Sequence, residues 1–368
     1  MRTQNPHREV SSALNEAEES ATAHQELQED QVRTTAAATI VSKPDAPQAS
    51  RPQDALRSSM DLPLSKTFYP LGFAVEVITN HPAVLRAAIE CFGHISSCRA
   101  TTQLQVRVGI SRGGDAFLPS EPTRREYNHL YSLVADTHNQ ALLDLETGIN
   151  FAWLSEAALM NPGYLRTNFL EKIVYLLLGA KHVTDVHAAC VSRFGRGILL
   201  CGDSGAGKST LAYACARAGW CYTSDDTSYL INGLEYPLVT GHAHRVRFRP
   251  TARELFPELA DREATPRMEG KPSIELPVAE LPLHSTSTDA RIDAIIYLNR
   301  FAGAQGRLAA LPKGTATERM QQDLFSAGDL RARHAKQLEI FTNVPTYSLE
   351  YCELPAAIAQ VDQLARGL

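Results

Sequence analysis

The sequence lacks several features that would assign it to a specialised class. Its seven cysteines are an odd number and form no Cys-x-x-Cys pair in 368 residues. We therefore expect free, mostly buried thiols, with neither a zinc site nor a disulfide framework. The longest apolar run, residues 173–180, is too short to span a membrane. The first residues do not form a secretory signal. These absences predict a cytoplasmic protein.

A strong charge of one sign is also missing. The chain carries 36 Lys and Arg against 41 Asp and Glu, a formal net charge of −5. Such a balance gives no field that attracts nucleic acid or an anionic membrane, so neither is expected as a partner. The hydrophobic content of 44% is ordinary for a globular protein.

Composition divides the chain into three parts. Residues 1–60 contain no Phe, Trp or Tyr and are predicted to be a disordered tail. Residues 61–183 are predicted to form a small α+β domain. Its expected elements are a strand within 68–78, a helix over 82–92, strands at 104–110, 130–135, 140–145 and 149–154, and a helix over 164–178. Residues 184–368 are predicted to form a mixed α/β domain, with strands at 198–201, 221–224, 245–249, 292–298 and 345–349.

One motif in the second domain carries specific chemistry. Residues 202–209 read Gly202-Asp203-Ser204-Gly205-Ala206-Gly207-Lys208-Ser209, followed by Thr210. This is a complete phosphate-binding loop, Gly-x-x-x-x-Gly-Lys-Ser. A short apolar run precedes it and an Ala-rich helical segment follows, so strand, loop and helix N-terminus coincide as nucleotide binding requires. In such a loop Lys208 reaches the β- and γ-phosphates, and the Ser209 hydroxyl binds Mg²⁺. No Asn-Lys-x-Asp guanine signature is present, so ATP is preferred to GTP.

Two adjacent carboxylates end the next predicted strand. Asp225 and Asp226 follow residues 221–224. A carboxylate at this place beside a phosphate loop can hold Mg²⁺ or accept a proton from an attacking hydroxyl. Adjacent residues on a strand point to opposite faces, so the two are expected to have different roles. The alternative is an Asp pair in a polar turn.

Two further features near the loop are ambiguous. His187 lies in an apolar stretch one strand before the loop; it is either a core residue or a group that orients an acid or contacts a phosphate. Arg245, Arg247 and Arg249 alternate, so on a strand they would share one face. That face would either bind phosphate or an acidic partner, or be an ordinary solvated surface.

Taken together, these residues resemble the catalytic domain of bacterial HPr serine kinase/phosphorylase. Ser209 is followed by a helix and then by a strand ending in Asp225-Asp226, and His187 precedes the loop. The likeness is concentrated in residues 183–232 and continues weakly to the end of the chain. It implies a mixed sheet similar to the nucleotide-binding domain of phosphoenolpyruvate carboxykinase. Relatives of the HPr kinase type assemble as hexamers, so the resemblance allows a homo-oligomer.

The resemblance also implies roles for single residues. Asp225 would be the base that accepts the proton of a serine hydroxyl, and Asp226 and His187 would support that geometry. Ser209 and Asp226 would hold Mg²⁺, Lys208 would contact the phosphates of ATP, and Arg249 would lie near the transferred phosphate. The implied reaction is transfer of the γ-phosphoryl group to a serine of a protein or peptide.

The sequence departs from the family pattern at two places. A metal-binding Glu of the family is replaced by Arg247, and the later Arg-rich loop linked to phosphorolysis has no clear match. HPr as acceptor and the phosphorylase reaction are therefore not carried over. Two alternatives stay open: a small-molecule kinase whose first domain forms the acceptor pocket, and a nucleotide-responsive binding module without catalysis.

Overall fold

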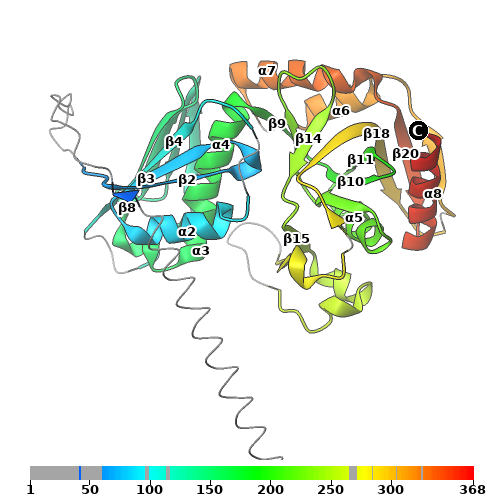
Figure 1. Cartoon of the computed structure of the whole chain (residues 1–368), viewed down its shortest axis with the longest axis horizontal. Helices are drawn as coiled ribbons and strands as arrows, with labels where there is room; N and C mark the ends of the chain where they lie inside the picture. Colours follow the sequence, from blue (N-terminus) through cyan, green and yellow to red (C-terminus); the bar gives the residue numbers. More distant parts are fainter. Residues whose placement is uncertain are drawn as a thin grey trace, which may run out of the picture.

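The structure is a computed structural model that describes residues 41–42, 60–95, 99–112, 117–264, 272–283, 285–303, 305–324 and 326–368. The expected tail, residues 1–60, lies almost wholly outside these ranges. Within it, β1 (Val41–Ser42) pairs antiparallel with β2 (Leu64–Phe68). Two large sheets lie side by side with helices packed against them, which makes a mixed α/β fold (Figure 1).

The first sheet has eight strands in the order β1-β2-β3-β4-β8-β7-β6-β5. The pairs β3–β4 and β4–β8 are parallel, and the others are antiparallel. Its further strands are β3 (Val75–Thr79), β4 (Leu104–Ser111), β5 (Thr123–Tyr127), β6 (Leu130–Val134), β7 (Gln140–Asp144) and β8 (Ile149–Ser155). The short helix η1 (Pro70–Gly72) lies between β2 and β3, and η2 (Glu156–Leu159) follows β8.

The helices of this half pack their apolar residues on the sheet. The predicted helix over 82–92 is confirmed as α2 (Pro82–Phe92). Pro82 suits the first helical position, and the His81 ring accepts a hydrogen bond from the Ala83 N–H at 3.2 Å. The single helix predicted over 164–178 is instead α3 (Pro162–Leu165), a π-helical turn η3 (Arg166–Leu170) and α4 (Glu171–Lys181).

The second sheet has ten strands. Eight follow the order β17-β12-β10-β11-β18-β14-β13-β9, and β20 pairs with both β18 and β19. The pairs β11–β18, β18–β20 and β12–β17 are parallel. The strands are β9 (Val183–Val186), β10 (Ala189–Arg193), β11 (Arg196–Cys201), β12 (Cys221–Ser224), β13 (Ser228–Ile231), β14 (Leu238–Gly241), β17 (Ser285–Thr286), β18 (Asp289–Arg300), β19 (Arg307–Ala310) and β20 (Thr346–Tyr351).

A separate two-stranded sheet joins β15 (Arg245–Phe248) to β16 (Ile274–Pro277). Four α-helices complete this half: α5 (Lys208–Arg217), α6 (Thr315–Gln322), α7 (Gly328–Leu338) and α8 (Leu354–Gly367). Short 3-10 helices are η4 (Pro250–Glu254), η5 (Pro257–Leu259), η6 (Val278–Glu280) and η7 (Glu339–Asn343). The predicted strand at 221–224 is confirmed, and the one predicted at 245–249 ends one residue earlier.

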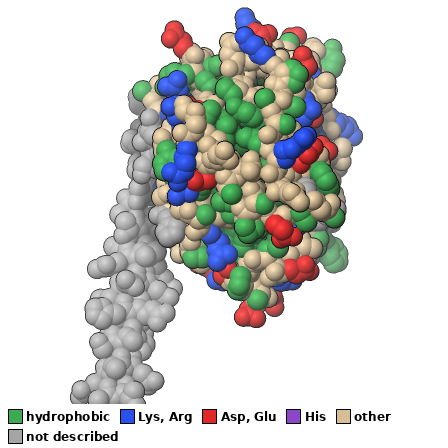
Figure 2. All heavy atoms as spheres, turned by 90° about the vertical axis from the view of Figure 1, so that its right-hand side faces the viewer, with side chains coloured by type: hydrophobic (Ala, Val, Ile, Leu, Met, Phe, Trp, Pro, Cys, Tyr) green, Lys and Arg blue, Asp and Glu red, His purple; other side chains and the backbone are tan. Residues whose placement is uncertain are grey.

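Hydrophobic cores lie on both sides of the second sheet. One contains residues of α5 and α8, and the other contains residues of α6 and α7. Val183 and Ile231 belong instead to the core of the first half, so apolar packing continues where the two halves meet. On the face at the right of Figure 1, charged side chains of both signs are interspersed (Figure 2).

Two expectations from composition can be compared with the structure. The six cysteines in the described ranges are all free, and four of them are buried, as predicted. Among the helices of the described residues, none is both long and apolar enough to cross a membrane.

Candidate functional site

The glycine loop (residues 202–207) connects the middle of the second sheet to a helix. It follows β11, which lies between β10 and β18, and α5 begins at Lys208. Gly207 has φ 98°, a conformation that glycine adopts at little cost. A Cβ atom there would overlap the Tyr351 hydroxyl, which donates a hydrogen bond to the Ala206 carbonyl at 3.0 Å. The loop is therefore held tightly at the start of α5, where the first backbone N–H groups lack helical acceptors and suit an anion.

Lys208 turns back over this loop. The residue is only 5% exposed, and Nζ donates to the Gly202 carbonyl at 2.6 Å and to the Asp203 carbonyl at 3.2 Å. Burial lowers the pKa of Lys208, and the Asp226 charge acts against that shift. A buried ammonium bonded mainly to neutral groups is poised to exchange them for anionic phosphate oxygens.

His187 links Lys208 to Asp226. The Lys208 Nζ lies 3.1 Å from His187 Nε2. An ammonium only donates, so Nε2 must accept and the ring proton sits on Nδ1. That nitrogen lies 3.6 Å from Asp226 Oδ1, too far for a direct hydrogen bond. The structure thus places His187 between the loop lysine and the second aspartate, rather than in the core.

Asp225 and Asp226 occupy different environments, as their alternation predicts. Asp226 is 55% exposed at its side chain, whereas Asp225 is 7% exposed. The Arg247 backbone N–H donates to Asp225 Oδ2 at 2.8 Å, and the Ser209 hydroxyl donates to the Asp225 carbonyl at 3.0 Å. Burial raises the pKa of Asp225 to about 6, with a smaller contribution from the Asp226 charge. A buried, oriented carboxyl group with such a pKa can accept a proton near neutral pH.

The three arginines do not form a common phosphate-binding face. Glu275 of β16 pairs with Arg245 and, at 3.1 Å from its Nε, with Arg247. Both guanidinium groups thus already share a carboxylate partner. Arg249 comes after β15, at the N-cap of η4, where it is exposed. Arg249 thus differs from the other two in lying off the strand and on the surface.

The donor set beside the loop can be compared with the needs of Mg²⁺. The described residues contain no group of three or more His, Cys, Asp or Glu side chains that could hold a metal ion. The Ser209 hydroxyl and the exposed Asp226 carboxylate are oxygen donors, which Mg²⁺ prefers, and this ion commonly takes its other ligands from phosphates and water. The residues present fit a metal that arrives with a nucleotide, and they do not form a closed protein cage.

Two residues of the site could not be found from sequence motifs. Tyr351 fixes the glycine loop from β20, and Glu275 fixes Arg247, whose backbone holds Asp225. Each lies far from its partner along the chain. Their only sequence signal is membership of a short alternating strand, which does not reveal the partner.

Comparisons with known proteins add little to this geometry. No protein-family model matches the sequence. No curated protein matches it either. Among solved structures, the Hpr(Ser) kinase/phosphatase from Coxiella burnetii is similar to 50% of this chain and to 99% of its own, at 12% identity and a TM-score of 0.27. So loose a likeness carries no argument about activity, and the resemblance over residues 183–232 stays a prediction.

Proposed function

We propose that this chain is a Mg²⁺- and ATP-dependent phosphotransferase that moves the γ-phosphoryl group to a hydroxyl, with a serine of a protein or peptide as acceptor. The observation that carries the proposal is the position of Asp225. Its buried carboxyl group accepts the Arg247 backbone N–H, and its backbone carbonyl accepts the Ser209 hydroxyl, next to a glycine loop at a helix N-terminus. A phosphate site and a candidate base are therefore directly joined.

The proposed step needs only groups that this site provides. The acceptor oxygen forms a bond to the γ-phosphorus, the bond between that phosphorus and the β,γ-bridging oxygen breaks, and ADP leaves. Asp225 accepts the hydroxyl proton and later releases it to solvent. Lys208 and the N–H groups at the start of α5 bind the phosphate oxygens. His187 holds Lys208 in place, and Arg249 approaches the transferred group.

A divalent cation would be held by Ser209 and Asp226. When bound it neutralises charge on the phosphate oxygens, which is its usual contribution to phosphoryl transfer. The exposed carboxylate of Asp226 suits this role better than Asp225, because the Asp225 oxygen Oδ2 already accepts the Arg247 N–H.

The test separates nucleotide binding from transfer. The full chain is titrated with ATP and Mg²⁺ by calorimetry, and transfer is followed with γ-labelled ATP and a desalted lysate from its own source. Lys208→Ala should lose both binding and transfer. Asp225→Asn should retain binding and lose transfer by about 100-fold or more, the range for a general base. Asp61→Asn changes net charge equally at an exposed aspartate and should behave as wild type.

Each outcome assigns the function differently. A labelled macromolecule that disappears in both site variants supports the proposal. ADP formation without a labelled macromolecule would move the acceptor to a small molecule. Tight ATP binding with no ADP would instead indicate a nucleotide-responsive binding module. Full transfer by Asp225→Asn would refute the assignment of the base.

A further inference from the structure

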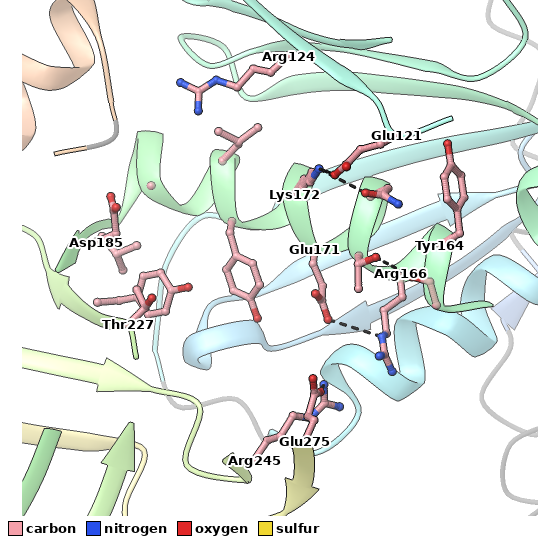
Figure 3. A pocket seen from close by; sticks show the side chains of 18 of the residues that line it. Glu121, Arg124, Tyr164, Arg166, Glu171, Lys172, Asp185, Thr227, Arg245 and Glu275 are labelled. Carbon is pink, nitrogen blue, oxygen red and sulfur yellow. Dashed lines mark hydrogen bonds and ion pairs between the residues drawn. The ribbon is translucent and has the colours of Figure 1, made fainter. Parts of the chain in front are cut away.

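A large pocket lies where the two halves of the molecule meet. Its volume is about 950 Å³, and its walls come from η3 and α4 on one side and from β9, β13 and the β15–β16 pair on the other (Figure 3). Tyr175 of α4 stacks on Tyr229 of β13 with ring centroids 5.7 Å apart, which joins the walls. The volume lies within the range of about 300–1,000 Å³ that is usual for ligand pockets.

Three residues connect this pocket to the candidate site. Thr227 lines the pocket and directly follows Asp226 in the sequence. Asp185, on β9, lines it two residues before His187, and it is the cross-strand partner of Tyr229. Glu275 lines it and pairs with Arg247, whose backbone N–H holds Asp225. The pocket and the site are therefore joined through these three residues.

The pocket lining contains equal numbers of cationic and carboxylate side chains, but one carboxylate has no ion-pair partner among the described residues. It is lined by four cationic and four carboxylate side chains: Arg124, Arg166, Lys172, Arg245, Glu121, Glu171, Asp185 and Glu275. Three of the carboxylates have cationic partners in the lining: Glu121 with Lys172, Glu171 with Arg166, and Glu275 with Arg245.

Asp185 is the exception among these carboxylates. Within the described part of the chain its side chain has no hydrogen bond and no ion pair, and it is only partly buried. Arg124, the remaining cation, pairs with Glu126 at 2.8 Å. Figure 3 shows Asp185 and Thr227 together at one end of the pocket. Asp185 is therefore the one carboxylate of the described lining without an ion-pair partner, and it lies beside Thr227, which follows Asp226 in the sequence.

We propose that this pocket receives the phosphoryl acceptor, and that Asp185 binds a cationic group carried close to the acceptor hydroxyl. This inference rests on the function proposed above. An ammonium or guanidinium group would complete the pairing of Asp185 through a charge-assisted hydrogen bond. A serine peptide with a neighbouring Lys or Arg has this chemistry, and so does an alcohol that carries an amino group.

The experiment uses the full chain with ATP and Mg²⁺ and defined acceptors. Three degenerate peptide pools share a central serine, with Lys, Gln or Glu fixed on both sides of it. D-glucosamine and D-glucose form a small-molecule pair. The measured quantity is kcat/KM for each acceptor with wild type, Asp185→Asn, Asp185→Lys and the control Asp61→Asn. Binding of the same fluorescently labelled peptide pools is measured in parallel, independently of turnover.

Wild type and Asp61→Asn should prefer the Lys pool to the Gln pool about tenfold, the effect of one hydrogen bond to a charged group. Asp185→Asn should bring this ratio close to one with little change for the Gln pool, and Asp185→Lys should favour the Glu pool. A preference confined to D-glucosamine over D-glucose, and lost in Asp185→Asn, would support the pocket with a small-molecule acceptor.

Failure of the pocket and failure of the phosphotransferase can be told apart. The pocket proposal is overturned if the three peptide pools are phosphorylated equally well, or if Asp185→Asn keeps the preference for the Lys pool. Either result leaves the proposed phosphotransferase activity standing. If ATP binds but no acceptor is labelled, the proposed phosphotransferase activity is refuted. The binding of the peptide pools then tests the pocket proposal by itself. Tighter binding of the Lys pool that depends on Asp185 then supports the pocket, and equal binding of the three pools overturns it.

Discussion

Replacing Asp225 with asparagine should slow transfer about 100-fold or more and, at pH 8, stabilise the folded protein. Burial raises the pKa of this carboxyl group from 3.8 to about 6. Each pKa unit corresponds to about 1.36 kcal/mol, so the ionised group costs the folded state about 3 kcal/mol. Asparagine cannot ionise, and its side-chain oxygen can still accept the Arg247 N–H. A weaker hydrogen bond would remove about 1 kcal/mol of the gain, which leaves about 2 kcal/mol.

Because the pKa of Asp225 is raised in the folded state, the stability of the protein depends on pH. The folded carboxyl binds its proton more tightly than the unfolded one, so its stabilising contribution is complete below about pH 3.8 and is lost as pH rises through about 6. The stability of wild type should therefore fall across this window relative to that of Asp225→Asn. Urea denaturation at pH 5 and pH 8 measures the difference. In a Trp153→Phe background, the buried Trp220 of the second half reports the transition.

Two results would refute this reasoning. One is an Asp225→Asn protein less stable than wild type at pH 8, and the other is a stability difference that does not change between pH 5 and pH 8. Asp226→Asn provides the matched comparison. The negative charge of Asp226 raises the pKa of Asp225, so its removal should shift the stability loss to lower pH.

Three further substitutions test the framework of the site. Lys208→Ala should weaken ATP binding in calorimetry at least about tenfold, because its charged hydrogen bond to phosphate is lost; unchanged affinity would contradict the loop assignment. Gly207→Ala should also weaken ATP binding, because its Cβ meets the Tyr351 hydroxyl. Adding Tyr351→Phe should restore part of that affinity, and no recovery would mean that the positive φ alone is decisive. Glu275→Gln should lower the free energy of unfolding by about 1–3 kcal/mol, because Arg247 loses its carboxylate; an unchanged denaturation midpoint would show that the pair contributes nothing.

Local elements with strong periodicity could be predicted from the sequence. The helix Pro82–Phe92 has a proline at its start and apolar residues at helical spacing, and its observed bounds equal the predicted ones. Tertiary packing decided the elements that were missed. The strand Thr123–Tyr127 is exposed along its whole length, so it carries no alternation that a sequence pattern could reveal. It exists because it pairs with its neighbour in a hairpin.

The site was predictable only in part, and for a related reason. The motif identifies Lys208 and Ser209, and the end of a buried strand identifies Asp225. The sequence left the role of the arginines open, because a choice needed the register of β15 against β16, which places Arg247 opposite Glu275. These strands are separated by a long connection, and no local pattern encodes which residues face each other across it.

The place of β11 in the second sheet has a consequence for the newly made chain on the ribosome. β10 precedes this strand, but its other neighbour, β18, begins at Asp289, about 90 residues after Cys201. At a synthesis rate of about 5–20 residues per second, the open edge of β11 waits roughly 4–18 s for its partner. During that time Ile198, Leu199 and Leu200 present an apolar strand with an unpaired backbone. The segment with the glycine loop is thus synthesised well before β18 can pair with β11. Until then, the exposed edge of β11 has to be kept from pairing with other strands.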